Sequence, residues 1–131
     1  MLNPKQFKSN DAWIVFRLNA APIHTERDGE FNCFALMDAA SCFILGTELI
    51  PAAASQLTRS EFRRLLANAR RHTSELPKTL FIPNGDGATL ATHEATKRGI
   101  EVVRAEESEL RVFIREAREG FAEHLEEQGD A

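Results

Sequence analysis

The fold is decided by residues 31–50, which read FNCFALMDAASCFILGTELI. Phe31–Met37 and Cys42–Ile50 consist mainly of residues that favour strands, and the four residues between them are typical of a turn. Upstream, Trp13–Leu18 is a third run of strand formers, separated from the second by a polar loop at His24–Glu30. The first fifty residues therefore predict a three-stranded antiparallel meander.

The periodicity of the sequence changes after Pro51. Apolar residues then recur at the spacing of one helix face, at Phe62, Leu65, Leu66 and Ala69. Thr58 and Glu61 have the spacing of a capping box, in which each side chain bonds the other residue's backbone N–H. This pattern predicts a helix that begins near Thr58 and ends before Pro77, because proline cannot continue a helix.

The rest of the chain alternates strands with helices. Thr79–Ile82 and Ile100–Val103 predict strands, and between them a helix is expected from about Asp86, with Gly99 as the residue just past its end. A last helix with Ser108 as its N-cap has one apolar face, made of Leu110, Phe113, Ile114, Ala117, Phe121 and Leu125. The order β-β-β-α-β-α-β-α predicts one α/β domain on a five-stranded mixed sheet, with residues 1–11 and 128–131 flexible.

The composition is typical of a soluble globular protein. The chain has 131 residues, of which 43% are hydrophobic, and this is enough for one core. No apolar run approaches the roughly 20 residues of a membrane span, and the polar N-terminal segment does not have the apolar region of a secretory signal. Cys33 and Cys42 lack the spacing of a redox or zinc site, so we expect reduced core cysteines and a cytoplasmic location.

Charge is unevenly distributed along the chain. The net charge of −4 argues against a dedicated nucleic-acid binder, because phosphate contacts need a basic surface. The first helix is nevertheless rich in arginine, with Arg59, Arg63 and Arg70 along one side, whereas the C-terminal segment is rich in glutamate. The arginines could bind phosphate, or they could form a solvated face that the acidic last helix, or its copy in a dimer, compensates.

The element order resembles that of the ribonuclease H-like fold, and the strand and turn sequences are similar to the catalytic cores of integrases and transposases. Three segments carry the resemblance: the strand that begins at Trp13, Leu36–Ile44 and Leu80–Gly85. The second is similar to the family's aspartate-containing turn between strands two and three, and the third to the strand and turn that hold a catalytic aspartate. The chain also resembles small bacterial domains of this fold that lack the metal site.

The resemblance implies a cluster of carboxylates at the centre of the sheet, because such enzymes hold divalent metals with oxygen ligands. Phe16 and Arg17 stand where the family places its first aspartate. Asn84 stands at the second position, with Asp86 two residues further on. We therefore expect no catalytic residue, no metal and no cofactor.

A divergent metal-dependent nuclease or phosphotransferase is the alternative. Its metal ligands would be Asp38, Asp86 and one of Glu106, Glu107 or Glu109, gathered near one edge of the sheet. Each residue also has a structural interpretation, because aspartate commonly bonds backbone amides in turns and glutamate favours helix N-termini. No metal-ligand spacing joins His24, His72, His93 and His124.

The turn after Ile82 is a candidate anion site. Asn84, Gly85 and Gly87 follow a strand and open a helix, where backbone N–H groups can bind an anion. The alternative is a structural turn in which Asp86 occupies the helix end as its N-cap.

These patterns favour a non-catalytic interaction or scaffold domain over an enzyme, with a non-catalytic nucleic-acid-binding domain as a further alternative. The apolar face of the last helix continues through Phe121 and Leu125, although its first turns are enough to cover the sheet. We therefore expect a protein partner, or a second copy of the chain, to bind the C-terminal helix.

Overall fold

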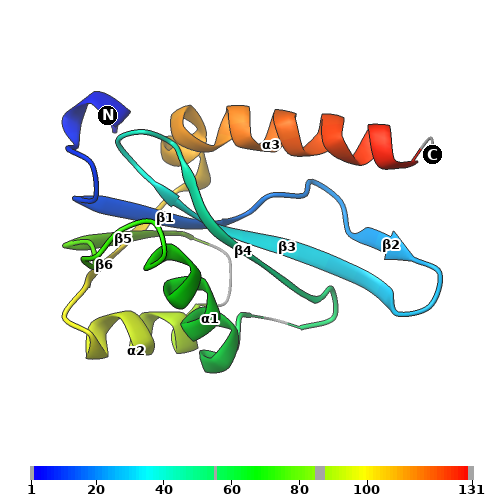
Figure 1. Ribbon diagram of the computed structural model, residues 1–131, viewed down its shortest axis with the longest axis horizontal. Coiled ribbons are helices and arrows are strands. Elements are labelled where there is room, and N and C mark those ends of the chain that lie inside the picture. The colour runs from blue at the N-terminus through cyan, green and yellow to red at the C-terminus, as the bar shows by residue number, and fades with distance from the viewer. Residues whose placement is uncertain (1, 55, 85–87, 130–131) are drawn as a thin grey trace.

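The computed structural model describes residues 2–54, 56–84 and 88–129 (Figure 1). One 3-10 helix, six strands and three α-helices follow one another along the chain. Their bounds are η1 (Pro4–Gln6), β1 (Ala12–Arg17), β2 (Ile23–Thr25), β3 (Gly29–Asp38), β4 (Ile44–Pro51), α1 (Arg59–Ala69), β5 (Thr79–Pro83), α2 (Thr89–Lys97), β6 (Glu101–Ala105) and α3 (Glu107–Gly129).

The strands form one mixed sheet, which confirms the predicted α/β class, and the predicted elements follow in the predicted order with one strand added, β2. β3 lies antiparallel to β4 on one side and to β1 on the other, so the predicted meander is present. β5 runs parallel to β1, with Ile14 opposite Phe81, and β6 runs parallel to β5. β2 pairs with the beginning of β3 beyond the end of β1.

The sixth strand, β2, lies in the segment that was predicted to be a polar loop. Asn19 holds the chain beside β3 between the end of β1 and the start of β2. Its buried side chain accepts a hydrogen bond from the backbone N–H of Cys33 (2.8 Å) and donates to the side chain of Asn32 (2.9 Å). Asn19 therefore bridges the gap between β1 and β2 along β3, a role that depends on residues more than ten positions away.

Helices cover both faces of the sheet (Figure 1). In β1, Trp13 and Val15 face the core shared with α1 and α2, whereas Ile14 and Phe16 face the core under α3. Because both faces are covered, β1 is buried at every position from Ala12 to Phe16. The arginine-rich α1 and the glutamate-rich α3 thus lie on opposite faces, so α3 does not compensate the α1 arginines within one molecule.

The helix ends agree with the sequence in part. Thr58 and Glu61 form the predicted capping box at the start of α1. Gly99 follows the last turn of α2 with φ of +80°, a conformation that glycine adopts readily. Since α3 begins at Glu107, the prediction of Ser108 as its N-cap is wrong, and Ser108 lies in the first turn. The predicted start of α2 at Asp86 lies outside the described residues.

The N-terminal segment, expected to be flexible, contacts the core under α3. The ring of Phe7 lies 5.8 Å from that of Phe81 and 6.1 Å from that of Phe113, measured between ring centroids. Asn10 donates a side-chain hydrogen bond to the backbone oxygen of Glu75. Within the described residues, no helix is long and apolar enough to cross a membrane.

Candidate functional site

The end of the sheet where the resemblance places metal ligands carries apolar, basic and amide side chains. Phe16 is buried under α3, with the guanidinium of Arg118 6.0 Å from its ring centroid. The side chain of Arg17 donates to the backbone oxygen of Asn19. The structure does bring Asn84 and Glu106 together, since the Asn84 amide donates to the Glu106 carboxylate at 2.9 Å.

Asp38 lies at the opposite end of the sheet. It stands opposite Trp13 at the beginning of β1, whereas Asn84 follows the end of β5, which runs parallel to β1. About four residues of strand, or roughly 13 Å, separate the two ends. Asp38 and Glu106 therefore cannot share a pair of metal ions, which lie about 4 Å apart in two-metal sites.

The Asp38 carboxylate is buried and occupied by hydrogen bonds from its own neighbourhood. It accepts from the backbone N–H of Asn10 (2.8 Å) and from the N–H and hydroxyl of Ser41 (3.0 and 2.8 Å). These bonds fix the turn between β3 and β4 and attach the segment before β1 to it. This geometry favours the structural interpretation of Asp38.

The remaining metal candidates are dispersed. Glu106, Glu107 and Glu109 are exposed at the start of α3, and Glu107 pairs with Arg118. Asp86, Gly85 and Gly87 lie outside the described residues. The four histidines lie on different elements or loops, and all are exposed. No group of three or more His, Cys, Asp or Glu suited to a metal ion is found in the described part of the chain.

The two cysteines are unpaired and shielded. Burial, with a smaller effect from Glu48, raises the pKa of the Cys33 thiol above its ordinary value. Burial also raises the pKa of Cys42, assisted by Glu116 and Asp38. A raised pKa keeps a thiol protonated at neutral pH, and a protonated thiol is a poor nucleophile.

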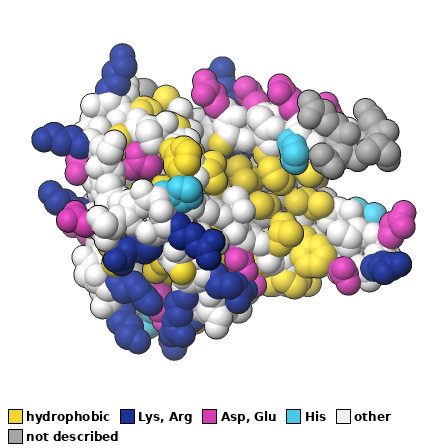
Figure 2. Space-filling view, in the orientation of Figure 1, with side chains coloured by type: hydrophobic (Ala, Val, Ile, Leu, Met, Phe, Trp, Pro, Cys, Tyr) yellow, Lys and Arg dark blue, Asp and Glu magenta, His cyan; other side chains and the backbone are white. Residues whose placement is uncertain are grey.

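The basic face of the molecule is organised around one buried carboxylate, Glu94 of α2. Figure 2 shows Lys and Arg side chains gathered over α1 and α2, and acidic side chains along α3. Arg63 of α1 makes a bidentate contact with Glu94, at 3.0 and 3.2 Å, and Arg98 binds the same carboxylate. Only 3% of the Glu94 side chain is exposed, so this pairing joins α1 to α2.

Three of the predicted basic residues therefore differ in their surroundings. Arg63 is engaged by Glu94, whereas Arg59 and Arg70 have no ion-pair partner among the described residues. Arg64, the next residue along α1, pairs with Glu48 of β4 at 2.6 Å. Of the α1 arginines, Arg63 is compensated by α2 and Arg64 by β4, and neither is compensated by the glutamates of α3.

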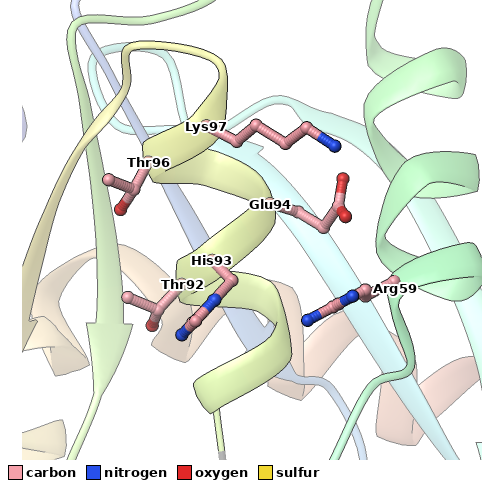
Figure 3. A pocket seen from close by; sticks show the side chains of 6 residues that line it. All are labelled: Arg59, Thr92, His93, Glu94, Thr96 and Lys97. Carbon is pink, nitrogen blue, oxygen red and sulfur yellow. The ribbon is translucent and has the colours of Figure 1, made fainter.

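A groove beside Glu94, hereafter the α1–α2 groove, has a volume of about 580 Å³. It is lined by Arg59 of α1 and by Thr92, His93, Glu94, Thr96 and Lys97 of α2. Arg59 extends from α1 toward α2, and Lys97 extends from α2 toward α1, on either side of Glu94 (Figure 3). Sequence reasoning missed Glu94 and Lys97. Glu94 could have been found from the sequence, because it lies on the same helix face as Ala91 and Ala95. A charged side chain on a buried face needs a partner of opposite charge.

The Glu94 pairing predicts a specific dependence of stability on pH. Hydrogen bonds from Arg63 and then Arg98 lower the pKa of Glu94 to about 2, from an ordinary value near 4.5. Because the folded pKa is depressed, the stabilisation is complete above about pH 4.5 and is lost as the pH falls toward 2. In thermal melts, Glu94→Gln is expected to lower Tm by several degrees at pH 7, and the gap from wild type should shrink below pH 4.5. Glu75→Gln, at an exposed position, is the control and should leave Tm nearly unchanged at both pH values.

A second groove is apolar and lies between the second half of α3 and the segment that follows β1. Its volume is about 230 Å³, and it is lined by Leu18, Asn19, Ala20, Ala21, Arg118, Phe121, Ala122 and Leu125. Figure 2 shows hydrophobic side chains exposed between α3 and the β2–β3 hairpin. This groove, hereafter the α3 groove, is where the predicted C-terminal interaction surface lies.

Comparison with known proteins shows which solved structures share the fold. No family model matches the sequence, and no curated protein matches it. The structure is similar to that of the HTLV-2 integrase catalytic core domain, solved with magnesium in a dimeric form (TM-score 0.53, 12% identity, 83% of this chain and 82% of that chain). It is also similar to the catalytic core domain of BIV integrase, with a TM-score of 0.52 and 13% identity. The match covers 93% of this chain and 74% of that chain.

A third similar structure is the simian T-cell lymphotropic virus intasome in complex with PP2A regulatory subunit B56 gamma. The TM-score is 0.52 and the identity 16%, and the match covers 73% of this chain but only 32% of the viral chain. These similarities confirm the predicted ribonuclease H-like fold. At such low identity, they show only that the fold is shared.

Proposed function

We propose that this chain is a non-catalytic interaction domain that binds a second copy of itself through the α3 groove. The observation that carries the proposal is the length of α3 relative to β1, the central strand beneath its first half. The 23 residues of α3 span about 35 Å, whereas the six residues of β1 span about 20 Å. The second half of α3 therefore extends beyond the end of β1, over the part of the sheet where β1 no longer contributes and β2 pairs with β3.

Burial along α3 follows this difference in length. Leu110, Phe113 and Ile114 in the first half are at most 1% exposed. Phe121 and Leu125 continue the same apolar face, but they are only partly buried and line the α3 groove. An apolar helix face without a covering element favours association.

A twofold axis beside α3 is the arrangement that covers this surface most simply. Phe121 and Leu125 of one copy would lie against the Leu18–Ala21 segment of the other copy, and the reverse contact would form at the same time. The dimeric form described for the HTLV-2 core is in keeping with pairing of domains that have this fold.

The absence of catalysis is proposed on the positions of the carboxylates. Asp38 is bound by the turn it stabilises, and Glu106 lies at the other end of the sheet beside Asn84. Phe16 and Arg17 fill the position on β1 where a ligand would be needed. The two unpaired cysteines support a reducing, cytoplasmic location.

The test is the mass of the protein in solution, measured by light scattering over a range of concentrations. Wild type is expected at twice the chain mass of 14.7 kDa. Phe121→Glu should raise the dissociation constant about 30-fold or more, because it places a charge in the centre of the interface. Leu125→Glu should act in the same direction.

The matched control is Val112→Glu. Val112 also lies on α3 and is 57% exposed, but it does not line the α3 groove. This variant should remain dimeric, and circular dichroism should show that all three variants keep the fold. A monomeric wild type at the highest concentration, or equal dissociation of the Val112 variant, would contradict the proposal.

A further inference from the structure

The α1–α2 groove concentrates positive charge on a chain whose net charge is negative. Residues 59–71 and 89–98 contain seven arginines and lysines but only two glutamates, whereas the whole chain has a net charge of −4. α3, on the other face of the sheet, carries seven of the chain's 20 acidic residues against three arginines (Figure 2). The groove is therefore a local region of positive potential, which attracts anions.

Two cations in the groove are available for a ligand. In the part of the chain that the structure describes, Arg59 and Lys97 pair with no carboxylate. Among the described residues that line the groove, Glu94 alone is acidic, and Arg63 and Arg98 already bind both of its oxygens. One carboxylate between two guanidinium groups leaves a net positive floor beneath Arg59 and Lys97.

The same contacts fix the distance between the groove walls. Glu94 is buried and holds Arg63 of α1 against α2, so the two helices that carry Arg59 and Lys97 are joined there. Glu94 lies between Arg59 and Lys97 (Figure 3). Because the pKa of Glu94 is about 2, this link stays charged at neutral pH. A site whose walls are held in place before binding loses less entropy when a ligand is bound.

We propose that the α1–α2 groove binds a small phosphorylated ligand, with Arg59 and Lys97 contacting its phosphate from opposite walls. Arginine matches the geometry of phosphate with two parallel donors, and lysine adds a compact charge. A phosphate monoester or diphosphate, with about two negative charges, matches two free cations better than a monocarboxylate does. The volume of about 580 Å³ lies within the range of small-molecule sites.

The experiment is calorimetric titration of the full chain with inorganic phosphate and with pyrophosphate at about 0.1 M ionic strength, where the Debye length is about 10 Å. Saturable binding of one pyrophosphate per chain is expected, tighter than that of phosphate. Arg59→Gln and Lys97→Gln should each weaken pyrophosphate binding by roughly tenfold, the effect of losing one charge-assisted hydrogen bond. Both side chains are exposed, so thermal melts should show that both variants fold normally.

The matched control is Arg70→Gln, which removes an equal charge just beyond α1 without touching the groove lining. It should change the affinity by less than about twofold, because distant surface charges are screened. An equal loss in this variant, or no saturable binding in wild type, would overturn the proposal.

Two further ligands test the chemical class. Succinate, a dicarboxylate, should bind more weakly than pyrophosphate, and equal affinity would overturn the assignment to phosphate. A DNA duplex should compete poorly with pyrophosphate. Strong duplex binding that falls equally in the Arg59 and Arg70 variants would instead indicate general attraction to a polyanion, and would also overturn the proposed site.

Discussion

Replacing Asp38 with alanine is expected to lower the free energy of unfolding by about 2–3 kcal/mol, because two backbone amides lose their acceptor. Asp38 accepts from the N–H groups of Asn10 and Ser41, and its side chain is buried. The loss extends further, since the Asn10 side chain accepts the indole N–H of Trp13 at 2.8 Å. Asn10 has φ of +69°, a conformation that asparagine tolerates but that needs support from its surroundings.

Chemical denaturation measures the free energy of unfolding of Asp38→Ala and of Ser41→Ala. Ser41→Ala removes the hydroxyl contact to Asp38 and the longer bond that the hydroxyl accepts from the Phe43 N–H (3.2 Å), but it keeps both backbone amides on the Asp38 carboxylate, so a smaller loss of about 1 kcal/mol is expected. Denaturation repeated with magnesium separates the structural role from a metal-ligand role. A wild-type protein that magnesium stabilises, together with an Asp38→Ala variant that it does not, would show that Asp38 binds metal.

The Asp38 turn illustrates what the sequence could predict. An aspartate between two strands predicts a side chain that bonds nearby amides, and its contacts with Ser41 are of this local kind. Its bond to Asn10 joins residues 28 positions apart, and no local pattern contains it. Local patterns also predicted α1, whose apolar stripe and capping box were visible in the sequence.

The basic face shows where sequence reasoning fails. Arg59, Arg63 and Arg70 are similar in the sequence, but only Arg63 reaches the buried Glu94 of another helix. Which arginine is paired depends on how α1 packs beside α2, and neither helix contains that information alone. The α3 surface was easier to foresee, because the length of an apolar stripe can be compared with the length of a strand before the fold is known.

The packing of α1 against β4 depends on Gly46. A Cβ atom at this position would lie 3.0 Å from the Cβ of Asn68 and 3.4 Å from the backbone oxygen of Leu65, both on α1. The 3.0 Å contact requires Asn68 to shift by a few tenths of an ångström, and a larger side chain at this position requires more. The sequence does not reveal this role, because Gly46 lies within a run of strand formers and has no turn signal.

Gly46→Val is accordingly expected to destabilise the protein by about 1–3 kcal/mol, since its two methyl groups would overpack the interface between β4 and α1. Gly120→Ala is the matched control, because a Cβ at Gly120 in α3 meets nothing within 4 Å. The control should stabilise the protein by roughly 0.5–1 kcal/mol, as alanine favours a helix interior over glycine. Urea denaturation of both variants measures the two effects, and an unchanged or raised midpoint for Gly46→Val would show that α1 does not approach β4 as closely as described.

Because α1 carries Arg59, a displacement of this helix should also weaken pyrophosphate binding to the α1–α2 groove, whereas Gly120→Ala should leave it unchanged.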